Sequence, residues 1–566
     1  MKKPANLLYS VDERPPLSVT LLNGLQHAGV IAINLVYPVI VFRSAGATTE
    51  TITALLGVGF CILGIATFLQ AYPKGPVGSG FMCPATFTAT YLAPSVLAAK
   101  TGGLSLVFGM TIFAGLLEAV FSRALHRMRA FVPVELSGLV IVLIGMTAGL
   151  VAVRALLGNA ASVPSTQEWI VAAITLGVTL ALNIWGRGLA RMLCALIGMV
   201  CGYLAAGWLG VLTLAELAPL GAADWIALPD LRHVSWSFDF SLAAAFAIAA
   251  LAAAMKALGT LTVCQRTNDA DWVRPDGVSN SRGVLADSLG TALAGALGGV
   301  GINTSTPSVG LVSATGVASR VVAYAVGAIF FALALAPKFA VLLAVMPRAV
   351  MAAALLFAAC FIVINGLQVV TSRLLDARRT LVIGLGLIAG AAVEAVPAIA
   401  AGVTGGMKPI IGSSLVFGTL VALVLNMLFR LGVRKTVSLN IDPAGYVPAD
   451  IDAFLRKQGA VWGARPDVVN RAIFGVSQLI EAVLEHGHPP GMLELQASFD
   501  EFNLDVRLRY EGAALEFPES RPSLSQIKDS DDGARRLAGY LLRRNADRVR
   551  AEQEGPRALI WFHFDH

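Results

Sequence analysis

The residues best suited to binding chemistry lie in two Gly/Ser/Thr/Pro-rich stretches of an otherwise apolar chain. One runs from Gly78 to Thr90 (GSGFMCPATFTAT) and the other from Leu297 to Arg320 (LGGVGINTSTPSVGLVSATGVASR). Backbone that leaves helical hydrogen bonding at membrane depth is tolerated only where protein buries it or a wet cavity solvates it. The two breaks occupy corresponding positions in the two halves of the chain. They therefore predict an inverted-repeat membrane protein with a binding site where two broken half-helices meet.

Lys256 is a cation inside the apolar run Ser241–Cys264. A charge at the bilayer centre costs roughly 2.5–3.5 kcal/mol even on lenient scales, so such a residue usually marks a substrate or ion pathway. Half-helices beginning near Pro84 and Pro307 would aim their positive N-terminal dipole ends at the same place. Together these features predict an anion-selective site. In the alternative interpretation, Lys256 pairs with Asp287 and only holds helices together.

Several other side chains in the two breaks are candidate substrate contacts. The first break could supply a stacking ring and hydroxyl groups, and the second could supply further hydrogen-bond donors. For each of them, plain helix packing is the alternative interpretation. The candidates are Thr86, Phe87, Thr88, Thr306, Pro307, Ser308 and Gly310.

The composition requires elements that span a membrane. The chain of 566 residues is 56% hydrophobic and 14% charged, with a mean hydropathy of +0.72; soluble domains carry roughly 25% charged residues. Runs near the roughly 20 residues that a bilayer requires, together with the two breaks and a weaker span at 283–297, predict about fourteen crossings. The uninterrupted runs are 21–42, 51–72, 104–125, 136–157, 169–185, 189–209, 241–264, 321–335, 350–370, 381–396 and 410–428.

Charge in the loops predicts the orientation. If the N-terminus is cytoplasmic, loops on that side carry about twice as many Lys and Arg residues as loops on the other side, as the positive-inside rule expects. Residues 1–16 then form a cytoplasmic tail without a signal-peptide pattern, and both termini lie in the cytoplasm of a bacterial cell whose inner membrane holds the protein. The net charge of +6 is thus a topology signal, and no nucleic-acid partner is expected.

Other function classes find no support in the sequence. The six cysteines lie in apolar segments without metal-ligand spacing, so they are interpreted as free packing thiols. The sequence contains no Walker loop, no HExxH motif and no GxSxG motif. We therefore expect neither an enzyme nor a pump driven by ATP, and no cofactor or metal.

The composition changes after Arg430, where a soluble domain begins. The stretch 467–486 has helical periodicity, and 493–510 alternates with the period of two that is typical of paired strands. A second helix is predicted at 534–550 and a closing strand at 558–564. The predicted domains are the tail 1–16, a transmembrane domain 17–432 and a cytoplasmic α/β domain 433–566, an α+β sandwich.

The membrane part resembles the nucleobase–ascorbate transporters, the uracil/xanthine permease (nucleobase:cation symporter-2) family. The resemblance rests on LLNGLQH at 21–27, FVPVELSGLVIVLIG at 131–145, RGVLADSLGT at 282–291, PSVGLVSATGVASR at 307–320 and LVALVLNMLF at 420–429. It implies an all-α polytopic fold of fourteen helices in two inverted sevens, with a core and a gate domain. It also implies a homodimer that moves its substrate by an elevator-like motion, with H⁺ or Na⁺ as the coupling ion. Gln26, His27 and Asp287 match family positions that shape the site or take part in coupling.

Two departures from the family pattern bear on the substrate. The signature Asn of the family is Ser308 here, and the preceding Glu or Gln is Pro307, which is similar to the ascorbate branch. The Glu that the family places three residues before the glycine equivalent to Gly259 is Lys256. A carboxylate that would accept nucleobase N–H groups has become a cation. This combination is similar to the related sulfate/bicarbonate transporters, which bind anions between the same half-helices.

The soluble tail resembles serine-kinase anti-sigma factors of the histidine-kinase-like ATPase superfamily. The stretch GVSQLIEAVLEHG at 475–487 is similar to their first conserved helix, but Gln478 and Ala482 replace the catalytic Glu and the magnesium-binding Asn. The acidic glycine motif is reduced to Tyr510-Glu511-Gly512. The resemblance thus implies a degenerate, regulatory or dimerising module without ATP chemistry.

Three function classes remain open from the sequence. The favoured one is a secondary active transporter in the lipid bilayer that moves a small polar or anionic solute, nucleobase-like by family. An anion transporter or exchanger for urate, a carboxylate or an inorganic anion is the alternative that Lys256 suggests. The second class is a sensor derived from a transporter that signals through its C-terminal domain, and the third is a channel.

Overall fold

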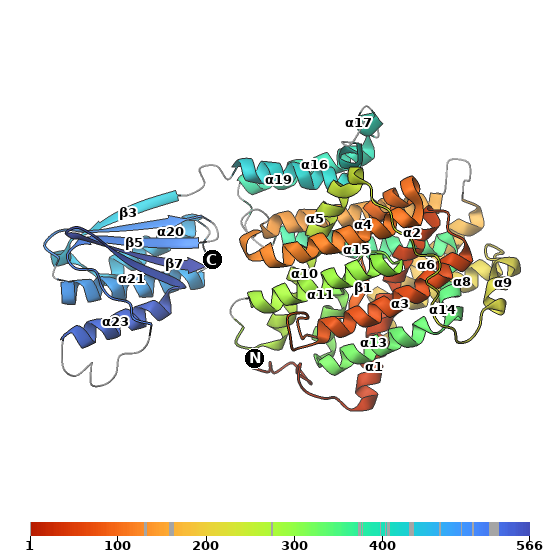
Figure 1. The fold of residues 1–566 in the computed structure, drawn as a ribbon, viewed down its shortest axis with the longest axis horizontal. Coiled ribbons are helices and arrows are strands. Elements are labelled where there is room, and N and C mark those ends of the chain that lie inside the picture. The colour runs from red at the N-terminus through yellow and green to blue at the C-terminus, as the bar shows by residue number, and fades with distance from the viewer. Residues whose placement is uncertain are drawn as a thin grey trace. The chain divides into compact units, whose positions relative to one another are not determined.

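The computed structural model describes residues 2–128, 133–157, 164–272, 275–371, 375, 377–396, 398–401, 403, 408–429, 435–462, 464, 466–487, 489–500, 503–519 and 531–565. The chain forms two compact units, Met1–Asn426 and Met427–His566. Figure 1 shows the mainly helical first unit and the second unit, which is built on a sheet.

The first unit follows the predicted order of apolar segments. Its elements are α1 (Leu17–Ala32), η1 (Ile33–Leu35), α2 (Val36–Ser44), α3 (Thr49–Ala71), β1 (Ala85–Phe87), η2 (Ala89–Tyr91), α4 (Leu92–Met128), α5 (Val134–Leu157), α6 (Thr166–Trp185), α7 (Leu189–Met192), α8 (Cys194–Trp208), α9 (Leu214–Ala222), η3 (Phe240–Leu242), α10 (Ala243–Asn268), α11 (Gly277–Leu297), β2 (Ile302–Thr304), α12 (Thr306–Thr315), α13 (Arg320–Ala334), α14 (Pro337–Ala344), α15 (Arg348–Val370), α16 (Ala377–Ala395), α17 (Ala398–Ala401), α18 (Lys408–Ile411) and α19 (Ser414–Phe429).

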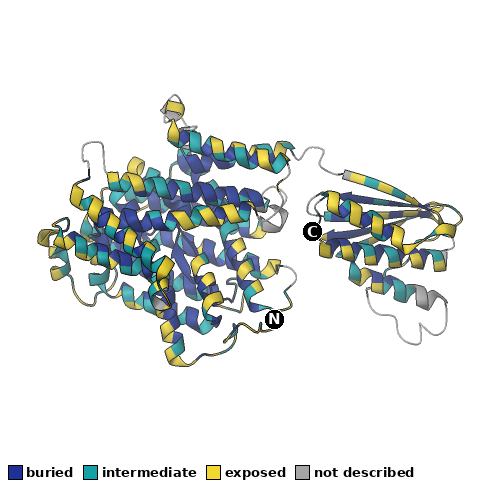
Figure 2. Cartoon of the chain, turned by 180° about the vertical axis from the view of Figure 1, so that it is seen from behind, coloured by how far each residue is buried: buried dark blue, intermediate teal, exposed yellow. Residues whose placement is uncertain are grey.

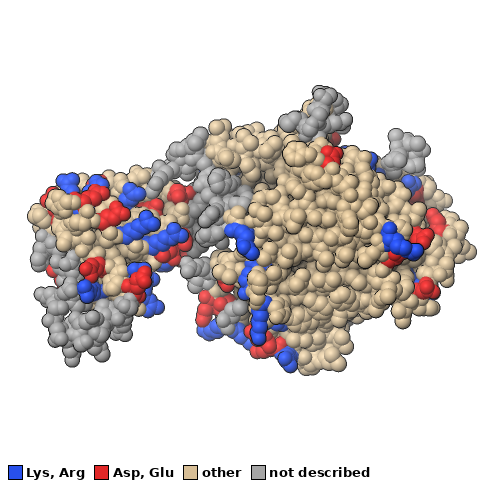
Figure 3. Space-filling model, viewed as in Figure 1, with Lys and Arg blue, Asp and Glu red and all other residues tan. Residues whose placement is uncertain are grey.

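These helices make the protein a multi-pass membrane protein. Among the described residues, seven helices are long and apolar enough to cross a bilayer, or eight if α13 and α14, bent by 81° at a short break, count as one span. Figure 3 shows a broad uncharged face on this unit, with Lys, Arg, Asp and Glu gathered beyond it at either end. That distribution is expected of a hydrocarbon-facing belt between two polar surfaces. The total of fourteen crossings stays a prediction.

Both predicted breaks are present, and each combines a short strand with a half-helix. β1 and β2 pair antiparallel, with Ala85 opposite Thr304, Thr86 opposite Asn303 and Phe87 opposite Ile302. The unit is mostly helical, as predicted, but the all-α fold class did not include these two strands of three residues each. The physical reason is that backbone outside a helix still needs hydrogen-bond partners at membrane depth, and the two breaks supply them to each other.

The half-helices turn back at glycines with left-handed backbone. Gly103, inside α4, has φ 68°, and Gly316, at the end of α12, has φ 69°. Only glycine adopts this conformation without strain. The first half-helix thus runs from η2 into α4 as far as Gly103, and α12 is its counterpart in the second half of the chain.

Close packing through small residues holds the helices in two groups. One group contains α3, α4, α10, α11 and α13, and the other contains α5, α6, α8 and α15, which α16 joins through α5. In the second group, a Cβ atom on Gly138 of α5 would lie 2.6 Å from the backbone N of Val370 on α15. Such backbone-to-backbone contact is typical of helix packing in membranes. η1, η2 and α10 contact α5 or α15, so they lie where the two groups meet.

The predicted N-terminal tail is packed against the first unit over much of its length. Leu7 and Val11 are buried, and Tyr9 forms a parallel bridge with Val317. The backbone N of Leu8 donates to Gly316 O at 2.8 Å, and Arg320 forms an ion pair with Asp12 at 2.8 Å. We call residues 2–13 the N-terminal strap; it fastens the α12–α13 turn.

The second unit is a five-stranded antiparallel sheet with helices on one face. Its elements are β3 (Lys435–Ile441), η5 (Pro443–Gly445), α20 (Pro448–Trp462), α21 (Pro466–Gly487), β4 (Leu493–Phe499), β5 (Asn503–Glu511), α23 (Asp531–Asn545), β6 (Arg548–Glu554) and β7 (Arg557–Asp565). The strand order is β3-β4-β5-β7-β6.

The core of this unit forms between the inward sheet residues and one side of each helix. Leu508 and Phe562 of the sheet and Val476 and Ile480 of α21 belong to one buried cluster. Figure 2 shows the alternation of buried and exposed residues along the strands. The predicted strands at 493–510 and 558–564 and the helix at 467–486 are confirmed. The helix predicted at 534–550 was too long, because the chain leaves it at Asn545 and pairs as β6.

Candidate functional site

β1 presents two different faces because side chains alternate along a strand. Phe87 is buried and its ring lies against Gly59 of α3, where an added Cβ would come within 2.9 Å of Cζ. The side chains of Thr86 and of Thr88, which follows the strand, point to the opposite face. Thr86 accepts a hydrogen bond from Asn34 Nδ2 at 2.8 Å, and Thr88 accepts one from Lys256 Nζ at 3.2 Å. The structure thus brings the two threonines toward polar partners and turns Phe87 into the α3 packing.

β2 follows the same alternation. Ile302 contacts α11, since a Cβ on Gly290 would lie 2.7 Å from Ile302 Cδ1. Asn303, directly opposite Thr86, donates from Nδ2 to the Ala253 carbonyl of α10 at 3.0 Å. The backbone N of Thr304 donates to Asp287 Oδ2 at 3.0 Å. Asp287 therefore ties the second break to α11.

One face of α10 contacts both breaks. Ala253, Lys256 and Thr260 follow the i, i+3, i+7 spacing of residues that share a helix face. Thr260 Oγ1 and Thr306 Oγ1 are 2.9 Å apart, and Thr260 also donates to the Lys256 carbonyl at 2.9 Å. The single α10 face therefore places the Lys256 ammonium between the start of the first half-helix and the start of the second.

Lys256 has no close acidic partner. In the part of the chain that the structure describes, it forms no ion pair with a carboxylate at 4.0 Å or less. Asp287, Cys83 and Glu118 interact with it electrostatically without such contact, and the side chain is partly exposed. Its one described hydrogen bond is to Thr88. The expected structural pairing with Asp287 is thus not formed as a direct ion pair.

The N-termini of both half-helices lie at this place. Thr88 is the N-cap of η2, and its Oγ1 accepts from the backbone N of Thr90 as well as from Lys256. Ser305 is the N-cap of α12 and makes no side-chain capping bond. Orphan N–H groups and the helix dipole make such ends favourable for anions. The ammonium, the hydroxyl groups and the positive end of the α12 dipole together can hold a small negative or strongly polar group.

The remaining candidates in the second break divide between buried and open positions. Ser308 is fully buried and donates to Ser305 Oγ at 2.8 Å. Pro307 and Gly310 are exposed, and a Cβ on Gly310 would meet nothing within 4 Å. Thr306 is partly exposed. The open side of α12 therefore contains Pro307 and Gly310.

Gln26 and His27 lie on α1 and are buried. Both ring nitrogens of His27 and Oε1 of Gln26 have no hydrogen-bond partner among the described residues. The structure does not bring either side chain into hydrogen-bond contact with Lys256. The role of Gln26 and His27 in shaping the site therefore stays a prediction.

Sequence reasoning missed three polar residues of this region. Asn34 lies on the 3-10 turn η1, which interrupts the first apolar run. Thr260 lies in the alanine-rich helix α10 and belongs to no motif. Glu118, the third, is completely buried and accepts a hydrogen bond from Tyr91 at 3.0 Å. A lone acid inside a spanning segment is itself a signal of function and could have identified Glu118.

The described residues contain no group of three or more His, Cys, Asp and Glu side chains that could hold a metal ion. What the site offers is hydrogen bonding and positive potential.

A model of the permease family of xanthine and uracil transporters matches residues 18–399. The chain belongs to this family. A Clostridium perfringens protein that carries the provisional name of a purine permease is 29% identical to this permease over 435 residues, with 75% of this chain and 93% of that protein covered. The xanthine permease XanP of Escherichia coli is 24% identical over 441 residues, with 75% and 95% covered. The xanthine permease of Bacillus subtilis is 25% identical over 421 residues, with 73% and 94% covered.

Solved structures similar to this permease are membrane transporters. The transmembrane domain of the cyanobacterial bicarbonate transporter BicA aligns with a TM-score of 0.45 and 15% identity, covering 74% of this chain and 99% of that one. Murine Slc26a9, an anion transporter in the inward-facing state, aligns with a TM-score of 0.48 and 12% identity, covering 80% and 79%. The family match and the permease relatives, rather than these structures, make the protein a transporter of a small molecule and not an enzyme.

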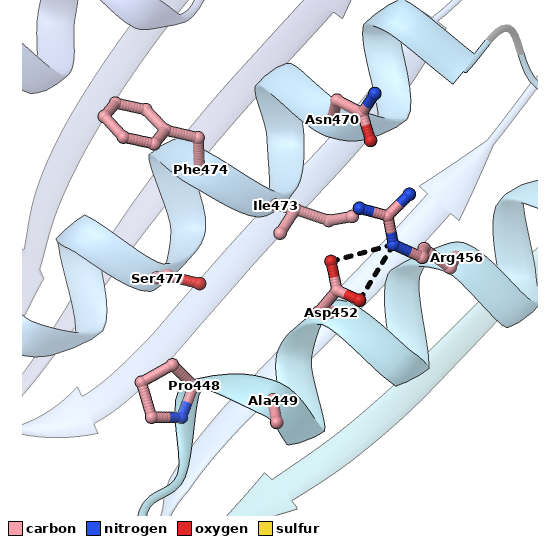
Figure 4. Close-up of a pocket in the computed structure, with 8 residues that line it drawn as sticks. All are labelled: Pro448, Ala449, Asp452, Arg456, Asn470, Ile473, Phe474 and Ser477. Atoms are coloured by element: carbon pink, nitrogen blue, oxygen red, sulfur yellow. Dashed lines mark hydrogen bonds and ion pairs between the residues drawn. The ribbon is translucent and has the colours of Figure 1, made fainter.

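The C-terminal unit of the permease contains a groove between α20 and α21. Its volume is about 470 Å³. Figure 4 shows Arg456 donating to Asp452 one turn away on the same helix, α20, while Phe474 and Ser477 line the α21 side. On α21, Gln478 is exposed and donates to Glu481, and Ala482 is buried in the core. The Ala482 side chain therefore offers no ligand atom, and Gln478 presents an amide in place of a carboxylate.

Proposed function

We propose that this permease is a secondary active transporter that binds a small anionic or nucleobase-like solute beside Lys256. The observation that carries the proposal is the position of the Lys256 ammonium, which donates to Thr88 at the start of one half-helix. Among the described residues, no carboxylate lies within 4.0 Å of it. A cation at membrane depth that lacks a protein counter-ion is stabilised when an anion binds.

The surrounding groups favour the same ligand. The N-terminus of α12 has no side-chain cap on Ser305, so its first N–H groups can donate to a bound oxygen. Helix N-termini are ready anion sites because these donors and the helix dipole act together. Thr88, Thr260 and Thr306 add hydroxyl groups within hydrogen-bond reach of the two half-helix starts.

A neutral nucleobase is the second candidate solute. Curated relatives are named xanthine permeases, and the amide side chains of Asn34 and Asn303 lie on the Thr86 side of the β1–β2 pair. Amides can bind both donors and acceptors of a base edge. Urate or a carboxylate would satisfy both the ammonium and the amides, so an anionic base analogue fits this set of groups best.

We infer an elevator-type motion in which the helix group containing the half-helices moves against the other. Each group is internally close-packed through glycines, as at Gly64 and Gly327 between α3 and α13 and at Gly138 and Gly366 between α5 and α15. The order of a long helix, a broken strand-and-half-helix and further helices occurs twice in the chain. This order supports the proposed inverted repeat.

The wider biological setting belongs to the same proposal. The permease works in a bacterial inner membrane with both termini in the cytoplasm, as a homodimer, with H⁺ or Na⁺ as the coupling ion. The domain limits are proposed as 1–16, 17–432 and 433–566. The C-terminal unit is proposed to be a degenerate histidine-kinase-like module that regulates or dimerises without using ATP.

Uptake and exchange into proteoliposomes test the proposal. Labelled xanthine, urate, a short carboxylate and sulfate are offered in turn to the wild-type protein and to Lys256→Ala. We expect saturable exchange with at least one anionic probe and its loss in the variant. A related xanthine permease in the same kind of vesicle is the positive control. If this control transports xanthine but the wild-type protein transports none of the probes, the proposal is wrong.

A further inference from the structure

Glu118 is a buried acid that the binding site described above does not use. It lies in the part of α4 that follows the bend at Gly103, and none of its surface is exposed. Its Oε2 accepts a hydrogen bond from the Tyr91 hydroxyl at 3.0 Å. Its Oε1 has no hydrogen-bond partner among the described residues, and the carboxyl group forms no ion pair within 4.0 Å in that part of the chain.

An ionised carboxylate in this setting would be costly. A buried charge that lacks a counter-ion and has one oxygen unpaired loses far more solvation than a single hydrogen bond returns. Burying the neutral acid costs less free energy, because only the solvation of a polar group is lost. The geometry thus fits a neutral, protonated carboxyl group.

Tyr91 connects Glu118 to the binding site. It is the last residue of η2, which begins directly after Thr88, the residue that accepts from Lys256. The Thr88 and Thr90 hydroxyls are 3.0 Å apart, and the Tyr91 ring lies so close to Gly301 that an added Cβ there would come within 2.1 Å of it. Tyr91 is therefore wedged between the two breaks with its hydroxyl on Glu118.

The charged groups facing Glu118 are few. Asp287 of α11 and Lys256 of α10 interact with it electrostatically, in addition to Tyr91 of η2. Lys100 and Arg123 lie on α4 itself and Arg266 lies at the end of α10. Four other charged residues of neighbouring elements have described partners away from Glu118. Arg43 of α2 donates to Ala344 O, Arg282 of α11 donates to Pro73 O, and α5 directs Glu135 to Arg379 and Arg154 to Glu394.

We propose that Glu118 is a proton-binding group that controls whether Lys256 accepts an anion. The inference rests on the proposed anion site. With Glu118 neutral and Asp287 ionised, the cluster of Lys256, Asp287 and Glu118 has no net charge. Loss of the Glu118 proton gives the cluster a charge of minus one, and the new carboxylate competes with the solute for the ammonium. Anion binding therefore favours the protonated form, and by linkage a proton on Glu118 strengthens anion binding.

Infrared spectroscopy on the ligand-free permease tests the protonation state without any substrate. We expect the carbonyl stretch of a protonated carboxylic acid at neutral pH in the wild-type protein and its disappearance in Glu118→Gln, which keeps an oxygen for Tyr91. Glu50→Gln, at an exposed position in the first turn of α3, is the matched control and should leave the band unchanged. A wild-type spectrum without this band at neutral pH would overturn the proposal.

Calorimetry with urate as the probe tests the control of binding. Titrations in two buffers of different ionisation enthalpy give the number of protons taken up with the anion. We expect wild-type affinity to weaken by up to about tenfold per pH unit above neutrality, the limit for one linked proton. Glu118→Gln should bind urate with less pH dependence and lower proton uptake. Equal pH dependence and proton uptake in both proteins would show that Glu118 is only structural.

A second variant keeps the test decisive if Glu118→Gln does not fold. Tyr91→Phe removes the one described hydrogen bond to the carboxyl group, so the acid band should move to the frequency of a free carbonyl. An unmoved band would contradict the pairing. Failure of wild-type urate and xanthine binding would reject the anion site, whereas the infrared result would still decide whether Glu118 holds a proton.

Discussion

Lys256 and Thr88 are 168 residues apart in the chain, and the Lys256 ammonium donates a hydrogen bond of 3.2 Å to the Thr88 hydroxyl. This contact joins α10 to the start of the first half-helix. It is also a weak anchor for an ammonium at membrane depth, because a hydroxyl does not neutralise charge. The positive charge of Lys256 is therefore not neutralised by this contact and can attract a ligand.

Replacing Lys256 should separate its charge from its packing. Loss of a charge-assisted hydrogen bond of roughly 1.5–3 kcal/mol predicts a 10- to 100-fold weaker affinity of Lys256→Ala for an anionic substrate. Lys256→Arg should keep part of the affinity, and Lys256→Glu should repel anions and favour a neutral nucleobase. Equilibrium binding measures all three variants.

Lys338 offers a matched control for these variants. Its ammonium lies 4.0 Å from the centre of the Trp225 ring, outside the candidate site. Lys338→Ala should bind the anion as the wild-type protein does. Wild-type affinity in Lys256→Ala would make that lysine structural.

Substitution of Gly310 tests whether the open side of α12 lines the solute pathway. A Cβ at this position would meet nothing within 4 Å, so Gly310→Leu should insert and fold normally. If the open side is the solute pathway, the leucine should reduce uptake by at least about tenfold, since it fills space that a ligand needs. Gly310→Ala is the smaller control and should keep most of the activity. Undiminished uptake by a well-folded Gly310→Leu protein would place the pathway elsewhere.

Gly301→Ala should instead damage the fold. Its Cβ would come within 2.1 Å of the Tyr91 ring, which is buried and cannot move away. Overpacking of this kind typically costs about 1–3 kcal/mol, so the melting temperature in detergent should fall. Gly207→Ala in α8, where an added Cβ meets nothing within 4 Å, should leave it unchanged. Equal melting temperatures for both variants would contradict the described contact.

His563 predicts a pH-dependent stability of the C-terminal unit. The hydrogen bond to Asp505, 2.7 Å from Nδ1, raises the pKa of His563, and Asp565 adds to the effect. Because the folded-state pKa lies above the unfolded value of about 6.5, the stabilisation is complete below that value. It is lost as the pH rises through the folded-state pKa.

Thermal unfolding of the fragment 433–566 at a series of pH values measures this contribution. The wild-type fragment should lose stability between slightly acidic and alkaline pH more steeply than His563→Gln does. Asp505→Asn should also flatten the dependence, since it removes the partner that raises the pKa. Identical slopes in the wild-type fragment and both variants would contradict the pairing.

The same fragment should not bind ATP. Ala482 is buried in the core and offers no metal ligand, and Gln478 is bound to Glu481. Calorimetry with millimolar MgATP should give no binding heat, with an intact anti-sigma kinase as the positive control. A clear heat of binding would reverse the interpretation of this unit as degenerate.

The breaks were predictable from sequence because their composition disfavours one continuous helix through the lipid. Gly, Ser, Thr and Pro cluster at 78–90 and 297–320, and the chain indeed leaves helical structure at β1 and β2. What the two strands do with their hydrogen bonds was not predictable. Pairing of Thr86 with Asn303 joins residues whose approach depends on the packing of many helices.

The polar residues that sequence reasoning missed share a physical cause. Asn34 and Thr260 matter because helix geometry turns them toward Thr86 and Thr306, and neither has a spacing or motif of its own. Phe87 shows the opposite error. Its ring was expected to stack on a substrate, but the alternation of β1 directs it into α3. The face of a strand three residues long cannot be read from so short a pattern.

The N-terminal strap has a consequence for biogenesis. Its partners include the α12–α13 turn and Asp269. The hydrogen bonds of Leu8 with Gly316 and of Lys2 with Asp269 can form only after these later residues have been synthesised. During synthesis at roughly 5–20 residues per second, the strap stays undocked until the second half of the chain has been made and inserted. Leu7 and Val11, buried in the finished protein, remain exposed until then. The earliest part of the chain is thus among the last to reach its place, and an unfinished or wrongly inserted permease displays an apolar segment that quality-control proteases can recognise.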